Sequence, residues 1–117
     1  MPEINQAKFA EFERSRAQLM NISAQKQQMQ IQSVTLGQAL EELGKTKEKK
    51  VYKAVGNILI QTETGKVKKE LKEKKDTVDL RLKTLQKQED SLINKLNKLK
   101  SEIESSQKPE PEPQKEK

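Results

Sequence analysis

The chain has 117 residues, of which 31% are hydrophobic and 36% are charged, and its formal net charge is +6. This composition offers little material for a compact core, and two phenylalanines and one tyrosine cannot anchor a conventional interior. The apolar side chains are therefore expected in a narrow seam or at contacts with partner chains. Because the chain has no cysteine and no histidine, it lacks disulfides, thiolate nucleophiles and the usual zinc ligands, which argues against an enzyme and against a cofactor.

A heptad pattern predicts a first long helix from about residue 5 to residue 43. Seven of its ten seam positions are apolar, as in a helix that packs against one partner helix. The ten positions are Phe12, Ser15, Leu19, Ile22, Lys26, Met29, Ser33, Leu36, Leu40 and Leu43. Lys26 and Ser33 weaken the middle of this seam. Gly37 indicates a close approach of a neighbour, and Gly44 is expected to end the helix in a left-handed conformation.

Residues 50–63 contain the only β-like segment. Two β-prone runs flank Gly56-Asn57, a dipeptide that suits a type II′ hairpin turn with a positive φ at the glycine. A lone hairpin is marginal in water and its edges invite pairing, so we expect strands of other subunits to complete the sheet. The alternative is a hairpin that merely ends a monomeric pair of helices. The expected assembly residues are Val51, Tyr52, Val55, Gly56, Ile58, Leu59 and Ile60.

A second heptad pattern predicts a helix from about residue 66 to residue 105, and eight of its ten seam positions are apolar. The positions are Leu71, Lys75, Val78, Leu82, Leu85, Glu89, Leu92, Leu96, Leu99 and Ile103. Both predicted helices contain about 40 residues, so they can close into an antiparallel coiled coil within one chain. The alternative is that each helix joins another chain in a parallel bundle.

Proline alternates with acidic residues near the end of the chain, which predicts a disordered tail at residues 107–117 after a structured domain of residues 1–106. The longest aliphatic run is Ile58 to Ile60, far short of the roughly 20 residues that span a bilayer. Residues 1–16 lack the apolar core of a secretory signal and contain acidic residues. We therefore expect no membrane span and a reducing, cytoplasmic setting.

Three segments connect these elements to a known family: ALEEL at residues 39–43, VYKAVG at 51–56 and ELKEK at 70–74. With one hairpin between two long heptad helices, they resemble the β-class subunits of archaeal and eukaryotic prefoldins over about residues 18–104. The α-class subunits have two hairpins, and residues 50–65 have room for one only. The resemblance implies a mainly α fold, in which a long antiparallel two-helix coiled coil carries one β-hairpin that completes an oligomeric β-barrel.

The same resemblance implies a function. It implies an ATP-independent chaperone subunit within a hetero-hexamer of two α-class and four β-class chains, which holds unfolded proteins at the coiled-coil tips and delivers them to a group II chaperonin. The geometry of two paired helices places these tips at the two chain ends. The expected client-binding residues are Ile4, Phe9, Phe12, Leu96, Leu99 and Ile103, whose other role would be to finish the coiled coil.

Two other functions compete with this interpretation. A basic coiled-coil scaffold would use the helices for dimerisation, but it leaves the hairpin unexplained. A nucleic-acid-binding protein would use residues 45–75, where eleven lysines stand against Glu48, Glu63, Glu70 and Glu73. Against nucleic acid, arginine is scarce and the few aromatic residues are not interleaved with the basic run.

Overall fold

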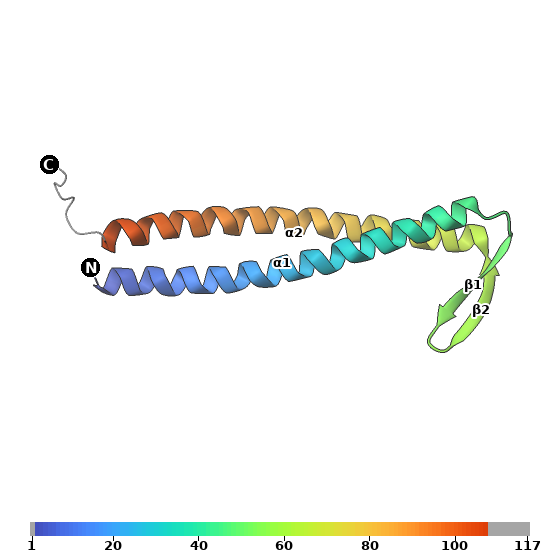
Figure 1. The fold of residues 1–117 in the computed structure, drawn as a ribbon, viewed down its shortest axis with the longest axis horizontal. Coiled ribbons are helices and arrows are strands. Elements are labelled where there is room, and N and C mark those ends of the chain that lie inside the picture. Colours follow the sequence, from blue (N-terminus) through green and yellow to red (C-terminus); the bar gives the residue numbers. More distant parts are fainter. Residues whose placement is uncertain (1, 108–117) are drawn as a thin grey trace. The chain divides into compact units, whose positions relative to one another are not determined.

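The computed structural model describes the backbone of residues 2–107 and the side chains of residues 6–105. The chain forms α1 (Pro2–Lys45), β1 (Lys50–Val55), β2 (Ile58–Glu63) and α2 (Thr64–Gln107), as Figure 1 shows. Each helix has 44 residues, so both extend a few residues beyond their predicted ends. The predicted tail lies outside the described residues apart from Gln107, which ends α2.

These elements make two compact units, each with segments of both helices. The first unit contains residues 1–25 and 85–117, and the second contains residues 26–84. The second unit therefore includes the hairpin and the parts of α1 and α2 that adjoin it. None of the helices in the described part of the chain has a stretch that is both long and apolar enough to cross a membrane.

In the first unit, α1 and α2 run side by side in opposite directions (Figure 1). Leu85, Leu99 and Ile103 from α2 are buried together with Ser15 from α1. Ion pairs flank this seam, with Lys8 Nζ 3.3 Å from Glu102 Oε1 and Lys95 Nζ 3.3 Å from Glu11 Oε2. Such exposed pairs contribute little to stability, so the buried apolar side chains carry the packing.

In the second unit, Val78 is the buried apolar residue of the seam, and the leucines around it are half-buried. Every seam position that the two heptad patterns predict, in either unit, is buried or half-buried. The two helices of one chain therefore pack against each other in antiparallel fashion. This arrangement confirms the intrachain coiled coil and disfavours the parallel bundle.

Of the two predictions made for glycines of α1, one is confirmed and the other is wrong. A Cβ atom added at Gly37 would lie 3.3 Å from Cε of Lys75, so the predicted close approach is confirmed. The left-handed ending at Gly44 is wrong, since α1 continues through Gly44 to Lys45. The N–H of Thr46 donates to the carbonyl of Glu42 at 3.1 Å, which satisfies an end carbonyl without a left-handed residue.

The hairpin has the predicted two-residue turn. Val55 pairs with Ile58 in the antiparallel register, and Gly56 has a φ of 60°. Asn57 has no positive φ, so the turn fits type II′ and not type I′. Two strands make up the whole sheet within the described residues, and the predicted oligomeric barrel stays a prediction.

Buried Thr64 fastens the base of the hairpin. Its hydroxyl donates to the carbonyl of Glu48 at 2.7 Å, and its N–H donates to the carbonyl of Lys49 at 2.9 Å. On the other side of the loop, the N–H of Glu48 donates to Oγ1 of Thr46 at 3.2 Å. These bonds join the residues that lead into β1 to the first residue of α2, so the hairpin has a defined attachment.

Candidate functional site

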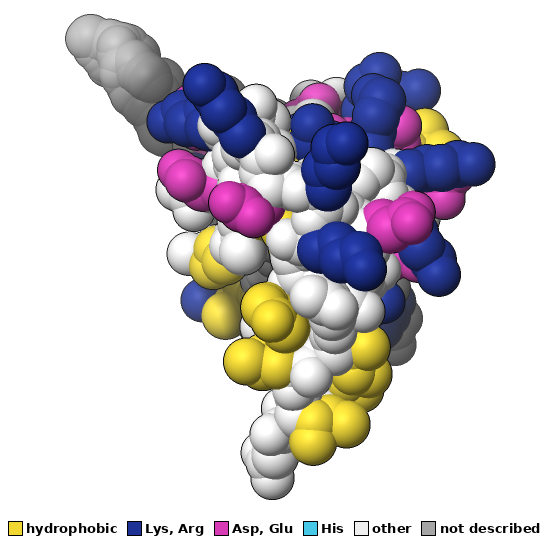
Figure 2. Space-filling model, turned by 90° about the vertical axis from the view of Figure 1, so that its right-hand side faces the viewer, with side chains coloured by type: hydrophobic (Ala, Val, Ile, Leu, Met, Phe, Trp, Pro, Cys, Tyr) yellow, Lys and Arg dark blue, Asp and Glu magenta, His cyan; other side chains and the backbone are white. Residues whose placement is uncertain are grey.

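The apolar side chains of the hairpin are exposed to solvent. Ile58 and Leu59 are 61% and 68% exposed, although burial is the usual state of such residues. Figure 2 shows hydrophobic side chains gathered on the hairpin, which points downward in that view. Several large apolar side chains exposed on one short element are typical of an interaction site rather than of a free surface.

Both faces of the hairpin contribute to this surface. The register places Tyr52 beside Gln61 and Ala54 beside Leu59 on one face. The other face carries Val55 with Ile58 and Lys53 with Ile60. Each strand also has one edge without a partner strand in the part of the chain that the structure describes. Unpaired N–H and C=O groups along such edges are a template for further strands.

One face of the hairpin is tied to α2. Nζ of Lys53 lies 3.4 Å from Oε1 of Glu70, and Val51 and Thr62 are half-buried near the base. The predicted assembly residues therefore lie on one hairpin, and Gly56 forms its turn. Of the seven, Val51 is half-buried and the other six are exposed.

The predicted client-binding residues are less uniform. Leu99 and Ile103 are buried in the seam, Phe12 and Leu96 are half-buried, and the side chain of Ile4 lies outside the described residues. Phe9 alone among the described members of this set is exposed, at 53%. The structure thus brings the two ends of the chain together as predicted, but it uses most of these side chains to join the helices.

Comparison with known proteins bears on this architecture. A family model described as prefoldin subunit matches residues 6–110. The chain belongs to the prefoldin family. Its relatives include the prefoldin subunit beta of Thermococcus onnurineus, 36% identical over 93% of this chain and 95% of the relative. The prefoldin subunit beta of Archaeoglobus fulgidus is 38% identical over 86% of this chain and 88% of the relative.

A solved structure agrees with these relatives. The crystal structure of the prefoldin beta subunit from Thermococcus strain KS-1 matches with a TM-score of 0.81 and 35% identity, over 90% of this chain and 93% of that chain. The resemblance to β-class prefoldins is confirmed, and with it the fold of two long helices and one hairpin. The chain is a chaperone subunit of a family whose members assemble with other prefoldin subunits, and a scaffold or nucleic-acid-binding role is not favoured.

Several exposed apolar side chains of this prefoldin chain lie outside the heptad seams and were missed by sequence reasoning. They are Met20, Ile31, Val34, Leu80 and Ile93. For Met20, Ile31 and Val34 of α1, the sequence does contain a signal. Residues 17–40 have a single charged residue, Lys26, so the outer face of this part of the helix is unusually poor in charge. With Gln27, Gln30 and Thr35, the residues Ile31 and Val34 line a groove of about 350 Å³.

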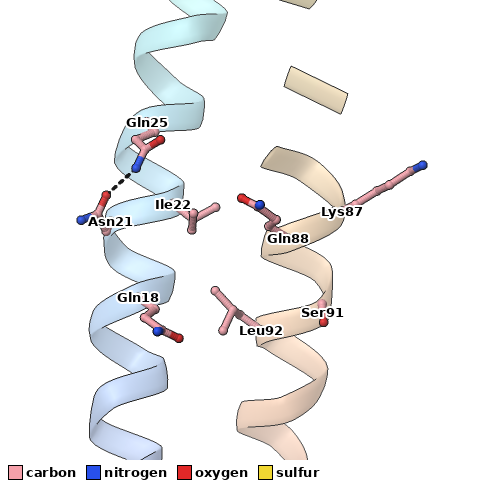
Figure 3. Close-up of a pocket in the computed structure, with 8 residues that line it drawn as sticks. All are labelled: Gln18, Asn21, Ile22, Gln25, Lys87, Gln88, Ser91 and Leu92. Carbon is pink, nitrogen blue, oxygen red and sulfur yellow. Dashed lines mark hydrogen bonds between the residues drawn. The ribbon is translucent and has the colours of Figure 1, made fainter. Parts of the chain in front are cut away.

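A larger groove of about 610 Å³ lies between the helices in the first unit. Figure 3 shows Ile22 of α1 and Leu92 of α2 pointing toward each other across the groove. Gln18 lies on the α1 side of the groove and Gln88 on the α2 side. Nε2 of Gln25 donates to Oδ1 of Asn21 at 2.7 Å on its rim. The lining combines apolar groups with amides and has one cation, Lys87, whose side chain points away from the groove.

Asp79 accepts two side-chain hydrogen bonds in the second unit. Lys75 Nζ donates to its Oδ2 at 2.8 Å and Ser33 Oγ donates to its Oδ1 at 2.6 Å. The hydrogen bond from Lys75, followed by that from Ser33, holds the pKa of Asp79 below its ordinary value. The described residues contain no cluster of acidic side chains that could hold a metal ion. The exposed side chains and strand edges of the hairpin offer apolar contact and strand pairing.

Proposed function

We propose that the chain is a β-class subunit of a prefoldin hetero-hexamer of two α-class and four β-class chains. In this proposal the hexamer holds unfolded proteins without ATP and delivers them to a group II chaperonin in the cytoplasm. The observation that carries the proposal is a hairpin whose apolar side chains and strand edges are both unpartnered within the described chain. No other element of the fold needs another chain so clearly.

The hairpin supplies the assembly contact. Burying one large apolar side chain contributes about 1.5–3 kcal/mol, and the hairpin exposes several of them, including Ile58, Leu59 and Ile60. Pairing of the strand edges adds hydrogen bonds and fixes the direction in which a neighbouring strand can join. A shared sheet with hairpins of other subunits satisfies both needs at once.

The chain ends supply client binding. Phe9 is exposed in the closed seam, and Leu99 and Ile103 become accessible only when the helix ends separate. A few apolar groups on one subunit bind an unfolded segment weakly and without sequence specificity. Several subunits of one hexamer acting together raise the effective affinity, because the later contacts are intramolecular. Partial burial of these side chains therefore suits reversible holding.

Suppression of the aggregation of a chemically denatured test protein, followed by light scattering, tests this function. The hexamer is formed with an α-class subunit and contains either the natural chain or Phe9→Gln. We expect Phe9→Gln to weaken suppression severalfold at unchanged native mass. Leu80→Gln is the matched control, since Leu80 is 66% exposed and lies in the other unit. Equal protection by the natural and Phe9→Gln hexamers contradicts client binding at the chain ends.

A further inference from the structure

Eight lysines surround the attachment of the hairpin, and we call them the lysine collar. They are Lys47, Lys49, Lys50, Lys66, Lys68, Lys69, Lys72 and Lys74. All eight are exposed. In the described part of the chain, none of them forms an ion pair, whereas Lys45, Lys53 and Lys75 do. The collar is therefore a set of charges that the subunit itself leaves uncompensated.

The collar concentrates the charge of the whole chain. Residues 45–75 contain eleven lysines and four glutamates, an excess larger than the net charge of +6 for all 117 residues. The remainder of the chain is close to balanced. Figure 2 shows Lys and Arg side chains around the helix ends, directly beside the apolar hairpin. Any subunit that docks on the hairpin consequently meets this charge.

Part of the collar converges on a recess. Lys49, Lys50 and Lys68 line it together with two acidic residues, Glu48 and Glu63, and its volume is about 490 Å³. Lys66 lies in the first turn of α2, where the helix dipole disfavours a cation, and this turn contains no acidic residue. The lysines of the recess thus outnumber its glutamates by three to two, and the dipole of α2 does not compensate Lys66 beside it.

We infer that the collar selects the assembly partner, and that the subunit surface docking beside this hairpin is acidic. The inference rests on the proposed assembly role of the hairpin. Two copies of this chain that paired through their hairpins would bring two collars together, and their like charges would oppose the contact. A partner with carboxylates beside its own hairpin would instead be attracted. The apolar hairpin supplies the affinity, and the collar sets the choice between copies of itself and other subunits.

A collar-reversed variant of the full chain serves as the acidic probe. It carries Lys66→Glu, Lys68→Glu, Lys69→Glu and Lys72→Glu. A control variant carries the same change of charge elsewhere on α2, at Lys83→Glu, Lys87→Glu, Lys98→Glu and Lys100→Glu, which are exposed and distant in sequence from the collar. Sedimentation velocity measures association of the natural chain alone, with the collar-reversed chain and with the control chain, at low and high salt.

We expect the natural chain to bind the collar-reversed chain at least about tenfold more tightly than it binds itself, a difference of about 1.4 kcal/mol. High salt should strengthen self-association of the natural chain and weaken the mixed complex, because screening acts on both repulsion and attraction. The control chain should bind like the natural chain.

Oligomers that form equally in all three mixtures, at either salt concentration, overturn the charge preference and leave the assembly role intact. Absence of oligomers from every mixture overturns the inference, because acidic residues beside the hairpin then do not attract the natural chain. The assembly role itself is tested by native mass after mixing with an α-class subunit. A third outcome concerns nucleic acid. In this outcome the natural chain binds a single-stranded oligonucleotide, the collar-reversed chain does not, and the subunits show no charge preference. The lysines would then bind nucleic acid, and the inference would be wrong.

Discussion

Ser33 on α1 donates a hydrogen bond of 2.6 Å to Asp79 on α2, and both residues face the seam of the second unit. In the first unit, Ser23 donates in the same way to Glu89 at 2.7 Å. The two serines are as far apart along α1 as the two acids are along α2, so both bonds fit one antiparallel register. Leucine seams tolerate shifts of register, whereas a polar pair is satisfied in one register only.

Replacing Ser33 with alanine should destabilise the chain despite the higher helix propensity of alanine. The change leaves Asp79 without the serine hydroxyl, although Lys75 still donates to it. Urea unfolding followed by circular dichroism measures the effect. Ser91→Ala is the control, because Ser91 is exposed, and its gain in helix propensity of a few tenths of a kcal/mol should stabilise slightly. Equal shifts for both variants would show that the hydroxyl of Ser33 contributes nothing.

Asp79 should make stability depend on pH in the acidic range. Its pKa lies below the ordinary value of 3.8 in the folded chain, so the folded state favours the carboxylate. The resulting stability is present above the unfolded pKa and is lost as the pH falls through the folded pKa. The urea midpoints of the natural chain and Asp79→Asn should therefore converge as the pH drops from about 5 to about 2. A constant difference across this range would assign the effect to packing.

Leu85 and Leu80 form a matched pair for the seam. Leu85 is fully buried and Leu80 is 66% exposed, although both lie on α2 within five residues of each other. Leu85→Ala should lower the free energy of unfolding by about 2–3 kcal/mol, since a large buried group is removed. Leu80→Ala should change it by less than about 0.5 kcal/mol. Comparable losses in denaturant unfolding would mean that the outer face of α2 is also packed.

Ile58→Asp should prevent assembly without unfolding the chain. Ile58 is 61% exposed in the single chain, so the helical circular dichroism signal should not change. In a shared sheet the new carboxylate would be buried without a partner, at a cost of about 3–5 kcal/mol, or more than about a hundredfold in association.

The measurement is native mass after mixing with an α-class subunit, with Val34→Asp as the control on an equally exposed helix position. A hexamer that forms with Ile58→Asp would exclude the hairpin from the interface.

Much of this fold follows from periodicity alone. Every position that the heptad patterns assigned to the seam is buried or half-buried, and Gly56-Asn57 identified the turn, because spacing and turn chemistry are local properties. The prediction for Gly44 failed because the N–H of Thr46 satisfies the helix end, and sequence does not reveal such a bond.

The site was predicted less completely than the fold. The hairpin residues were selected because an unpaired strand is conspicuous in a helical chain, and their role in assembly stays a prediction. The degree of burial at the chain ends could not be predicted, because a seam residue such as Leu99 looks the same in sequence whether the helices close over it or separate. Exposed Ile31 was missed because the heptad pattern examines only the seam.

The bond from Thr64 to Glu48 bears on the order in which the chain can fold. It joins residues 16 apart in sequence, whereas Ser33 and Asp79 are 46 apart, and Ser23 and Glu89 are 66 apart. The entropy lost on closing a loop grows with its length, so the hairpin base is the least costly long-range contact to form first. Once this contact has formed, each further contact between α1 and α2 closes only the short loop between itself and the previous contact. The pairing of α1 with α2 can thus proceed from the hairpin outward. The ends of the helices, where we propose that clients bind, are then the last to close and the first to open.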